Sequence, residues 1–207
     1  MSKILVTGGT GYIGSHTVVE LQNAGYTPVI VDNLVNSNAG VLEQIQKITG
    51  IRPEFHNFDL CDEAKVRQFV ADHPDITGII HFAAYKAVGE SVAQPLKYYH
   101  NNFFSLINLL NAYAGKPVNF VFSSSCTVYG QPDRLPVTEA APVKRAESPY
   151  GNTKQVSEEV LSETAAAFDN YKIISLRYFN PVGAHESALI GELPIGVPQN
   201  LVPFITQ

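Results

Sequence analysis

The strongest constraint on the fold comes from six short apolar runs that are separated by helix-length segments. In several of these runs, apolar and β-branched residues stand on consecutive positions rather than on alternate ones. Strands with this pattern are buried on both faces, as they are in a parallel sheet that carries helices on both sides. The predicted strands are residues 4–7, 28–31, 54–56, 78–82, 119–122 and 173–176.

The segments between these runs carry apolar residues at spacings of three and four, which is typical of amphipathic helices. Their ends carry helix signals, since Gly25 follows the first segment and Ser148-Pro149 opens the last. Alternating strands and helices form βαβ units with right-handed crossovers. The sequence therefore predicts an α/β fold with a doubly wound parallel sheet. The predicted helices are residues 12–24, 39–48, 62–71, 95–114 and 149–168.

Composition and charge exclude several classes of function. The chain has 207 residues, with 14 basic and 19 acidic side chains, a formal net charge of −5 and no basic cluster. This balance argues against a nucleic-acid or anionic-membrane surface. No apolar stretch approaches the roughly 20 residues that span a bilayer. The N-terminus runs straight into the first strand without a secretory signal, so a cytoplasmic protein is predicted.

Cysteine and histidine usage gives no sign of a disulfide framework or a metal centre. Two cysteines, Cys61 and Cys126, are too few for a disulfide scaffold or a Cys-rich zinc site. The six histidines are scattered and show no H-E-x-x-H or Cys–His spacing. No metal site is therefore predicted.

A glycine-rich loop, Thr-Gly-Gly-Thr-Gly-Tyr-Ile-Gly at residues 7–14, joins the first strand to the first helix. Glycine permits the unusual backbone angles of such a turn, and it lets the chain approach a pyrophosphate at the helix N-terminus. A glycine turn without a ligand is the alternative, and the position at the first strand–helix junction disfavours it. Asp32 ends the second strand, where a carboxylate accepts hydrogen bonds from a ribose and repels a 2′-phosphate. NAD is thus favoured over NADP, with a plain turn at Asp32-Asn33 as the alternative.

Tyr150 and Lys154 stand four residues apart at the start of the last predicted helix, which places the phenol and the ammonium on one face. A tyrosine titrates near 10, so base catalysis near pH 7 requires a shift of roughly 3 units, or about 4 kcal/mol. We expect the Lys154 charge and a cationic nicotinamide to supply this shift together. Three serines, residues 123–125, follow the fifth strand at the edge where ligands of parallel sheets bind. They either satisfy a turn or donate to a reacting hydroxyl.

Together these motifs resemble the extended short-chain dehydrogenase/reductase superfamily, and six longer blocks resemble its UDP-glucose 4-epimerase family over the whole length of the chain. The resemblance implies a Rossmann-type NAD-binding domain, bound NAD, and epimerisation at C4 of a UDP-hexose in galactose metabolism. Ala84 and Cys126 depart from the pattern, where glycine and alanine are common. The matching blocks are residues 7–16, 32–34, 81–91, 122–130, 148–151 and 176–185.

The resemblance also implies roles for individual residues. Tyr150 would be the catalytic base, Lys154 would bind the nicotinamide ribose, and Ser125 would lie near the sugar 4-hydroxyl. A homodimer would form through the helices that hold Phe103 and Pro149. The implied cofactor contacts are Gly8, Gly11, Tyr12, Ile13, Gly14, Asp32, Asn33, Asn36, Ser37, Asp59, Leu60, Phe82, Ala83, Lys86, Asn101, Tyr150, Lys154 and Phe179. The implied contacts with a UDP-sugar are Lys86, Ser125, Tyr150, Asn180, Asn200 and Leu201.

Two other functions remain open at this point. A sugar-nucleotide 4,6-dehydratase of the same superfamily would need a carboxylate just before the Val-Tyr-Gly segment, and Cys126 and Thr127 carry none. A cofactor-binding domain without catalysis, such as a redox sensor, would have no use for a polarised tyrosine. Whether N-acetylated sugars are accepted is not determined by these residues.

The six strands end by about Leu176, which leaves 31 residues, with four prolines in 179–207 and an apolar end at 201–207. We therefore expect an NAD-binding domain at 1–178 that carries the catalytic residues. Residues 179–207 would begin a nucleotide-sugar-binding region, with most of a smaller C-terminal domain absent. Such a chain should bind NAD better than it turns over sugar, and it should expose apolar surface near Phe204.

Overall fold

Six parallel strands form one sheet in the order β3-β2-β1-β4-β5-β6, in a computed structural model that describes residues 2–194 and 201–206. From β1 the chain moves to β2 and β3 on one side, and then returns to β4, β5 and β6 on the other. The switch point therefore lies between β1 and β4, as in doubly wound folds. The strands are β1 (Lys3–Thr7), β2 (Thr27–Asp32), β3 (Glu54–Asn57), β4 (Ile76–His81), β5 (Val118–Ser125) and β6 (Tyr171–Tyr178). All six predicted strands are confirmed.

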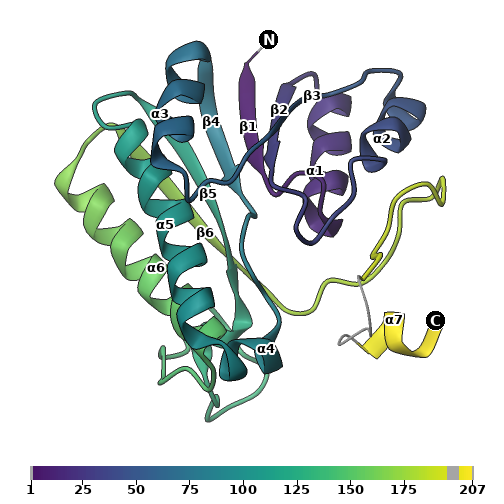
Figure 1. Ribbon diagram of the computed structural model, residues 1–207. Helices are drawn as coiled ribbons and strands as arrows, with labels where there is room; N and C mark the ends of the chain where they lie inside the picture. Colours follow the sequence, from purple (N-terminus) through teal and green to yellow (C-terminus); the bar gives the residue numbers. More distant parts are fainter. Residues whose placement is uncertain (1, 195–200, 207) are drawn as a thin grey trace.

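Helices cover both faces of the sheet (Figure 1). The five predicted helices are confirmed, with ends that differ by at most two residues. The pattern missed α4 and α7, because six residues are too few to show a helical period. The helices are α1 (Tyr12–Asn23), α2 (Val41–Thr49), α3 (Glu63–Asp72), α4 (Val88–Ala93), α5 (Pro95–Ala112), α6 (Pro149–Ala167) and α7 (Leu201–Thr206), with a 3₁₀ turn, η1 (Cys126–Tyr129).

Two hydrophobic clusters, one on each face, hold the helices to the sheet. On one face Val6 and Ile30 pack with residues of α1 and α2. On the other face Leu5 and Val29 pack with residues of α3, α5 and α6. Neighbouring residues of β1 and β2 thus enter opposite clusters, which is why their apolar side chains are consecutive in the sequence.

The edge strand β6 differs from the central strands, since its outer positions are exposed. Ile174 is 61% exposed, and Leu176 is 40% exposed. The expected apolar surface near Phe204 is also present, because Phe204 and Ile205 of α7 are both largely exposed. Within residues 2–194 and 201–206, no helix combines the length and the apolar character that crossing a membrane requires.

Candidate active site

The glycine loop lies at the carboxyl edge of the sheet, beside the switch point. Gly8 has a φ of +68°, and a Cβ at this position would lie 2.8 Å from the backbone nitrogen of Ala83. A Cβ on Gly14 would lie 2.2 Å from the carbonyl oxygen of Gly8. The loop is thus packed against itself and against the chain after β4. Gly11 occupies the N-cap of α1 without a side chain to cap it, so the first N–H groups of the helix remain open to an anion.

Asp32, at the end of β2, joins this loop to the next one. Its carboxylate accepts hydrogen bonds from the backbone nitrogens of Thr10 (3.2 Å) and Leu34 (2.9 Å) and from the Ser37 hydroxyl (3.2 Å). The Thr10 and Ser37 hydroxyls are 2.7 Å apart. Asp32 and Ser37 therefore stand beside the glycine loop, where the sequence predicted the adenosine ribose.

The other residues expected near the adenosine come from the loops after β2, β3 and β4. The Asn33 amide donates to Asp59 (3.2 Å), and Leu60 is buried next to it. Asn36 lies exposed in the loop after β2. Phe82 and Ala83 follow β4, and their backbone nitrogens donate to the Thr7 carbonyl (3.0 Å) and the Thr7 hydroxyl (3.4 Å). These contacts hold the loops of three strands around the glycine loop.

Tyr150 and Lys154 project from the first turns of α6, whose start is set by Ser148. The Ser148 hydroxyl accepts from the backbone nitrogen of Gly151 (3.1 Å), and Pro149 takes the first helical position. The buried Lys154 ammonium donates to the Ser123 carbonyl (2.7 Å) and lies 6.0 Å from the centroid of the Tyr150 ring. α6 and the end of β5 thus bring this pair together.

Burial dominates the electrostatics of this group. It raises the pKa of Tyr150, and the neighbouring Ser125 hydroxyl offsets part of that rise. It lowers the pKa of Lys154 to about 8, against the attraction of the Glu158 carboxylate. The expected fall of the Tyr150 pKa is therefore not produced by the chain alone, because desolvation outweighs the groups that favour the phenolate.

A polar network behind this group was not predicted. The Glu158 carboxylate accepts from the Ser124 hydroxyl and from two nitrogens of Arg177, at 3.0 and 2.6 Å. The Arg177 guanidinium lies 4.7 Å from the centroid of the Tyr129 ring. The network joins the ends of β5 and β6 to α6, one register position before Ser125. In the sequence, Glu158 could have been recognised by its position four residues after Lys154 on the same predicted helix. Nothing in the local sequence indicated that it pairs with Arg177.

The remaining predicted contacts are less closely gathered. The Lys86 ammonium pairs with Glu192 (3.6 Å), and the Phe179 ring stacks on Tyr129 (6.2 Å between centroids). Asn101 lies on α5 and donates to Asn102 (3.0 Å). Tyr12 and Ile13 open α1, where the Tyr12 hydroxyl donates to the Gly183 carbonyl (2.7 Å). The exposed Asn180 follows β6 with a φ of +40°, and Leu201 begins α7. Asn200 lies outside the described residues.

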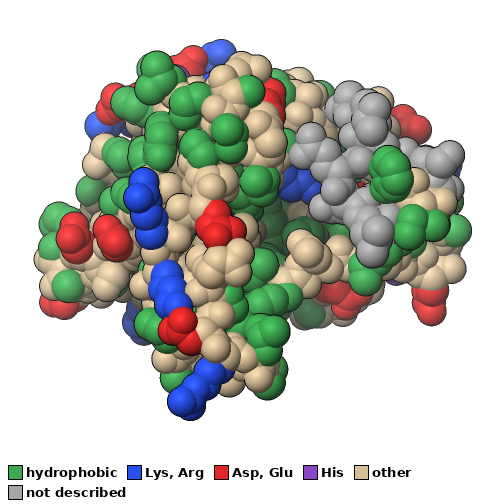
Figure 2. Space-filling model, turned by 90° about the horizontal axis from the view of Figure 1, so that it is seen from below, with side chains coloured by type: hydrophobic (Ala, Val, Ile, Leu, Met, Phe, Trp, Pro, Cys, Tyr) green, Lys and Arg blue, Asp and Glu red, His purple; other side chains and the backbone are tan. Residues whose placement is uncertain are grey.

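The glycine loop and the group of Tyr150 and Lys154 lie at the same edge of the sheet. The carboxyl ends of the strands point downward in Figure 1, and Figure 2 looks onto this edge, whose middle is hollowed and bordered by hydrophobic side chains. An open parallel sheet binds its ligands at such an edge, next to the switch point. Residues 4–193 match the profile of the NAD dependent epimerase/dehydratase family.

The chain belongs to this family.

Similar proteins agree with this assignment. The chain is 50% identical over 205 residues to a UDP-glucose 4-epimerase of Yersinia pestis, with 99% of this chain and 60% of the relative covered. It is 51% identical over 206 residues to the one of Dictyostelium discoideum, with 99% and 59% covered. The chain thus spans about 60% of the length of these curated relatives.

Two solved structures of UDP-glucose 4-epimerases superimpose closely on this member of the family. The structure from Stenotrophomonas maltophila, with bound NAD and formylated UDP-arabinopyranose, has a TM-score of 0.95 at 50% identity; 100% of this chain and 61% of that one are covered. The structure from Bifidobacterium longum, in complex with NAD+ and UDP, has a TM-score of 0.95 at 46% identity, with 99% and 61% covered.

Proposed function

We propose that the chain binds NAD and a UDP-hexose and epimerises the sugar at C4, so that UDP-galactose and UDP-glucose interconvert. The observation that carries the proposal is the group of Ser125, Tyr150 and the buried Lys154 at the carboxyl edge of the sheet, on the same edge as the glycine loop. The high identity to UDP-glucose 4-epimerases over nearly the whole chain supports the same reaction.

The residues at the edge fit NAD. The open N–H groups of α1 suit a pyrophosphate, and the packing at Gly8 and Gly14 leaves the loop backbone uncovered by side chains. The Asp32 carboxylate suits a ribose with free hydroxyls and disfavours a 2′-phosphate. Lys154 would hold the second ribose. When bound, NAD supplies reversible hydride transfer with C4 of the sugar.

In this proposal Tyr150 moves the proton. Its phenolate oxygen takes the proton of the sugar 4-hydroxyl as hydride leaves C4. After the 4-keto sugar has rotated to present the opposite face of C4 to the returning hydride, the phenol gives the proton back to the oxygen at C4. Ser125, which interacts with the phenol, would share the hydrogen bond to the 4-hydroxyl. The charge of the buried Lys154 ammonium favours the phenolate.

The reaction needs no further acid or base, and this separates it from 4,6-dehydration. A dehydratase must remove a proton at C5 and expel the C6 hydroxyl. Cys126 and Thr127, at the start of η1, offer no carboxylate for that step. NAD binding without turnover is the second candidate function, since the chain covers about 60% of its relatives.

The proposed division of labour follows the fold. Residues 1–178 would bind NAD and carry the catalytic group, and residues 179–207 would begin the nucleotide-sugar site. We place the protein in the cytoplasm and propose a homodimer through α5 and α6. The apolar side chains that α5 exposes support the dimer: Leu96 is 81% exposed and Phe104 is 48% exposed.

Incubation with UDP-galactose and NAD, followed by an assay for UDP-glucose, tests the reaction. Tyr150→Phe should retain NAD binding and lower turnover by about 10²- to 10⁴-fold, because only the proton transfer is lost. Tyr26→Phe, at an exposed tyrosine between α1 and β2, should behave as the wild type. A Tyr150→Phe variant with most of its turnover would exclude the tyrosine base. NAD binding by the wild type without any turnover would favour the second candidate.

A further inference from the structure

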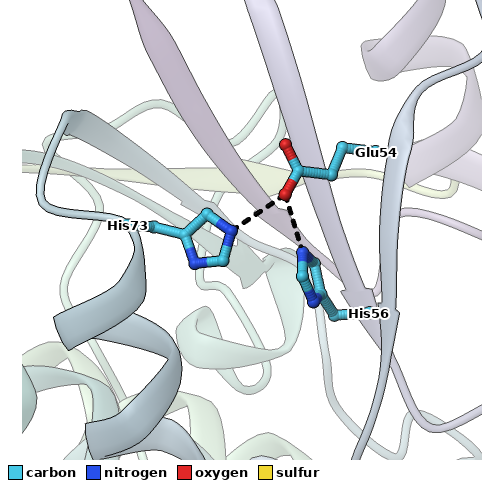
Figure 3. Close-up of side chains that lie close together, drawn as sticks. All are labelled: Glu54, His56 and His73. Atoms are coloured by element: carbon cyan, nitrogen blue, oxygen red, sulfur yellow. Dashed lines mark hydrogen bonds and ion pairs between the residues drawn. The ribbon is translucent and has the colours of Figure 1, made fainter.

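Glu54, His56 and His73 form a cluster that the sequence did not indicate. Glu54 and His56 stand two residues apart on the edge strand β3, and His73 is the C-cap residue of α3. The Nε2 atoms of both histidines lie 2.8 Å from one oxygen, Oε1 of Glu54. Figure 3 shows the two rings converging on this oxygen from different elements. All three ligand atoms lie within 4.8 Å of one another.

Packing holds the rings in this arrangement. The His73 ring stacks on Phe69, with 4.3 Å between centroids, and its side chain is only 12% exposed. The His56 ring meets His73 edge-on at 4.8 Å and Phe69 at 5.0 Å. Because the strand and the end of the helix are both parts of the packed fold, the cluster is largely preorganised.

Hydrogen bonding decides which nitrogen of His73 is available. Nδ1 lies 2.8 Å from the carbonyl oxygen of Phe69, and a carbonyl only accepts, so Nδ1 carries a proton. In the neutral ring, Nε2 then has a free lone pair that points at the Glu54 carboxylate. At 2.8 Å the two acceptors share a proton in a hydrogen bond, and a metal ion that binds both atoms displaces this proton. A ring whose other N–H donates to a backbone carbonyl is the usual arrangement of a metal-ligating histidine.

We propose that Glu54 Oε1, His56 Nε2 and His73 Nε2 bind a divalent transition-metal ion of the zinc class, with water in the remaining position. Two imidazoles and a carboxylate are a common donor set for this ion. A tetrahedral site with bonds of about 2.0–2.1 Å needs ligand atoms about 3.4 Å apart. The ligand atoms reach that spacing if the carboxylate withdraws and the imidazole nitrogens close in around the ion.

The position of the cluster favours a structural metal site rather than a catalytic one. It lies at the amino end of β3 and the carboxyl end of α3, at the sheet edge opposite the glycine loop. A bound ion would join the outermost strand to a helix that is anchored in the core through Val66 and Val70. The proposal is therefore independent of the epimerase function.

Zinc binding to the full chain, freed of metal by a chelator, tests the proposal. Zn²⁺ competed from a chromophoric chelator should bind at one equivalent per chain, and Co²⁺ should give the visible absorption of a four-coordinate site. Glu54→Gln and His73→Gln should each weaken Zn²⁺ binding at least 10-fold. His100→Gln, at an exposed histidine of α5, should leave it unchanged.

His56→Gln provides a second ligand variant, because this half-exposed side chain contributes less to the core than His73. Circular dichroism and unfolding by urea verify that each variant is folded. Equal Zn²⁺ affinity in the wild type and in folded His56→Gln and Glu54→Gln would overturn the proposal. So would the absence of stoichiometric binding by the wild type, or a loss of binding in His100→Gln as large as in the ligand variants.

Discussion

The two halves of the carboxyl edge are held by different means. Around β1 and β2, the glycine loop is held by backbone contacts, with Gly14 pressed against Gly8 and with Asp32 accepting from main-chain nitrogens. Around β5 and β6, the candidate catalytic group is held by side chains, with Lys154 and Glu158 as the central members.

This difference explains what each half tolerates. A backbone that is packed without side chains cannot yield to an added methyl group, so the first half should be intolerant of bulk. A group of buried and partly buried charges is held against the cost of desolvation, so the second half should respond to changes in charge and pH. The difference between the two halves can be measured as the change in the free energy of unfolding caused by substitutions in each half and at a residue that lies between them.

Gly14→Ala should have the largest effect. Its Cβ would lie 2.2 Å from the Gly8 oxygen and 2.8 Å from the Gly9 Cα, both of them backbone atoms. We expect the free energy of unfolding in urea to fall by about 3 kcal/mol or more, within the range of overpacking and strain. Gly11→Ala is the control, since its Cβ would lie 3.2 Å from the Gly8 oxygen; it should lose at most about 1 kcal/mol. Equal losses would show that close packing does not hold this half.

His81, on β4 between the two halves, should make the fold acid-sensitive. It is buried, its Nδ1 bonds to the Thr7 hydroxyl (2.8 Å), and burial lowers its pKa to about 3. Below pH 6.5 His81 takes up a proton in the unfolded chain, whereas in the folded chain it stays neutral down to about pH 3. The free energy of unfolding therefore falls as the pH falls.

Between pH 6.5 and 4.5 this linkage amounts to about 2 kcal/mol. The His81→Asn variant cannot take up this proton. Over this interval its free energy of unfolding should therefore fall by about 2 kcal/mol less than that of the wild type. The comparison is made on urea unfolding curves at several pH values. Parallel pH profiles for the wild type and the variant would show that His81 takes up its proton without unfolding.

Glu158→Gln should weaken the second half without changing its shape. It removes the charge that meets the partly buried Arg177 guanidinium, whose side chain is 23% exposed. We expect a loss of about 2 kcal/mol, below the 3–5 kcal/mol for breaking a fully buried pair. Glu159→Gln, at the exposed neighbouring position, should stay within about 0.5 kcal/mol of the wild type. Similar values for the two variants in thermal and urea unfolding would exclude a supporting role of this network.

Lys154→Met should have the smallest effect and the opposite sign. The folded pKa of Lys154, about 8, lies below the unfolded value near 10.4, so burying the cation costs stability below pH 8. Removing it should raise the unfolding free energy at pH 7 by about 1 kcal/mol, after the lost hydrogen bond to Ser123 is subtracted from about 3 kcal/mol.

This gain should shrink as the pH rises from 8 toward 10.4, where the wild-type lysine loses its proton in both states. Lys172→Met, at an exposed lysine of β6, is the matched control and should show no such pH dependence. A variant less stable than the wild type at pH 7 would show that the Lys154 charge stabilises this half.

The strand and helix order, the sheet type and the glycine loop followed from local patterns in the sequence. Consecutive apolar residues in β1 and β2, the glycines at 8 and 14, and the Ser148-Pro149 start of α6 each act within a few residues of where they stand. Backbone preferences and hydrophobic periodicity are short-range, so such features are legible before folding.

Tertiary structure decided the partnerships. Glu158 meets Arg177 across 19 residues, Thr7 meets His81 across 74, and His73 meets Glu54 across 19. The register of neighbouring strands and the docking of helices bring these residues together. Burial, which sets the direction of the pKa of Tyr150 and Lys154, likewise exists only in the folded chain. Residue types and their spacing in the sequence identify the candidate groups. The distances between these groups and their desolvation govern their chemistry, and both depend on the whole fold.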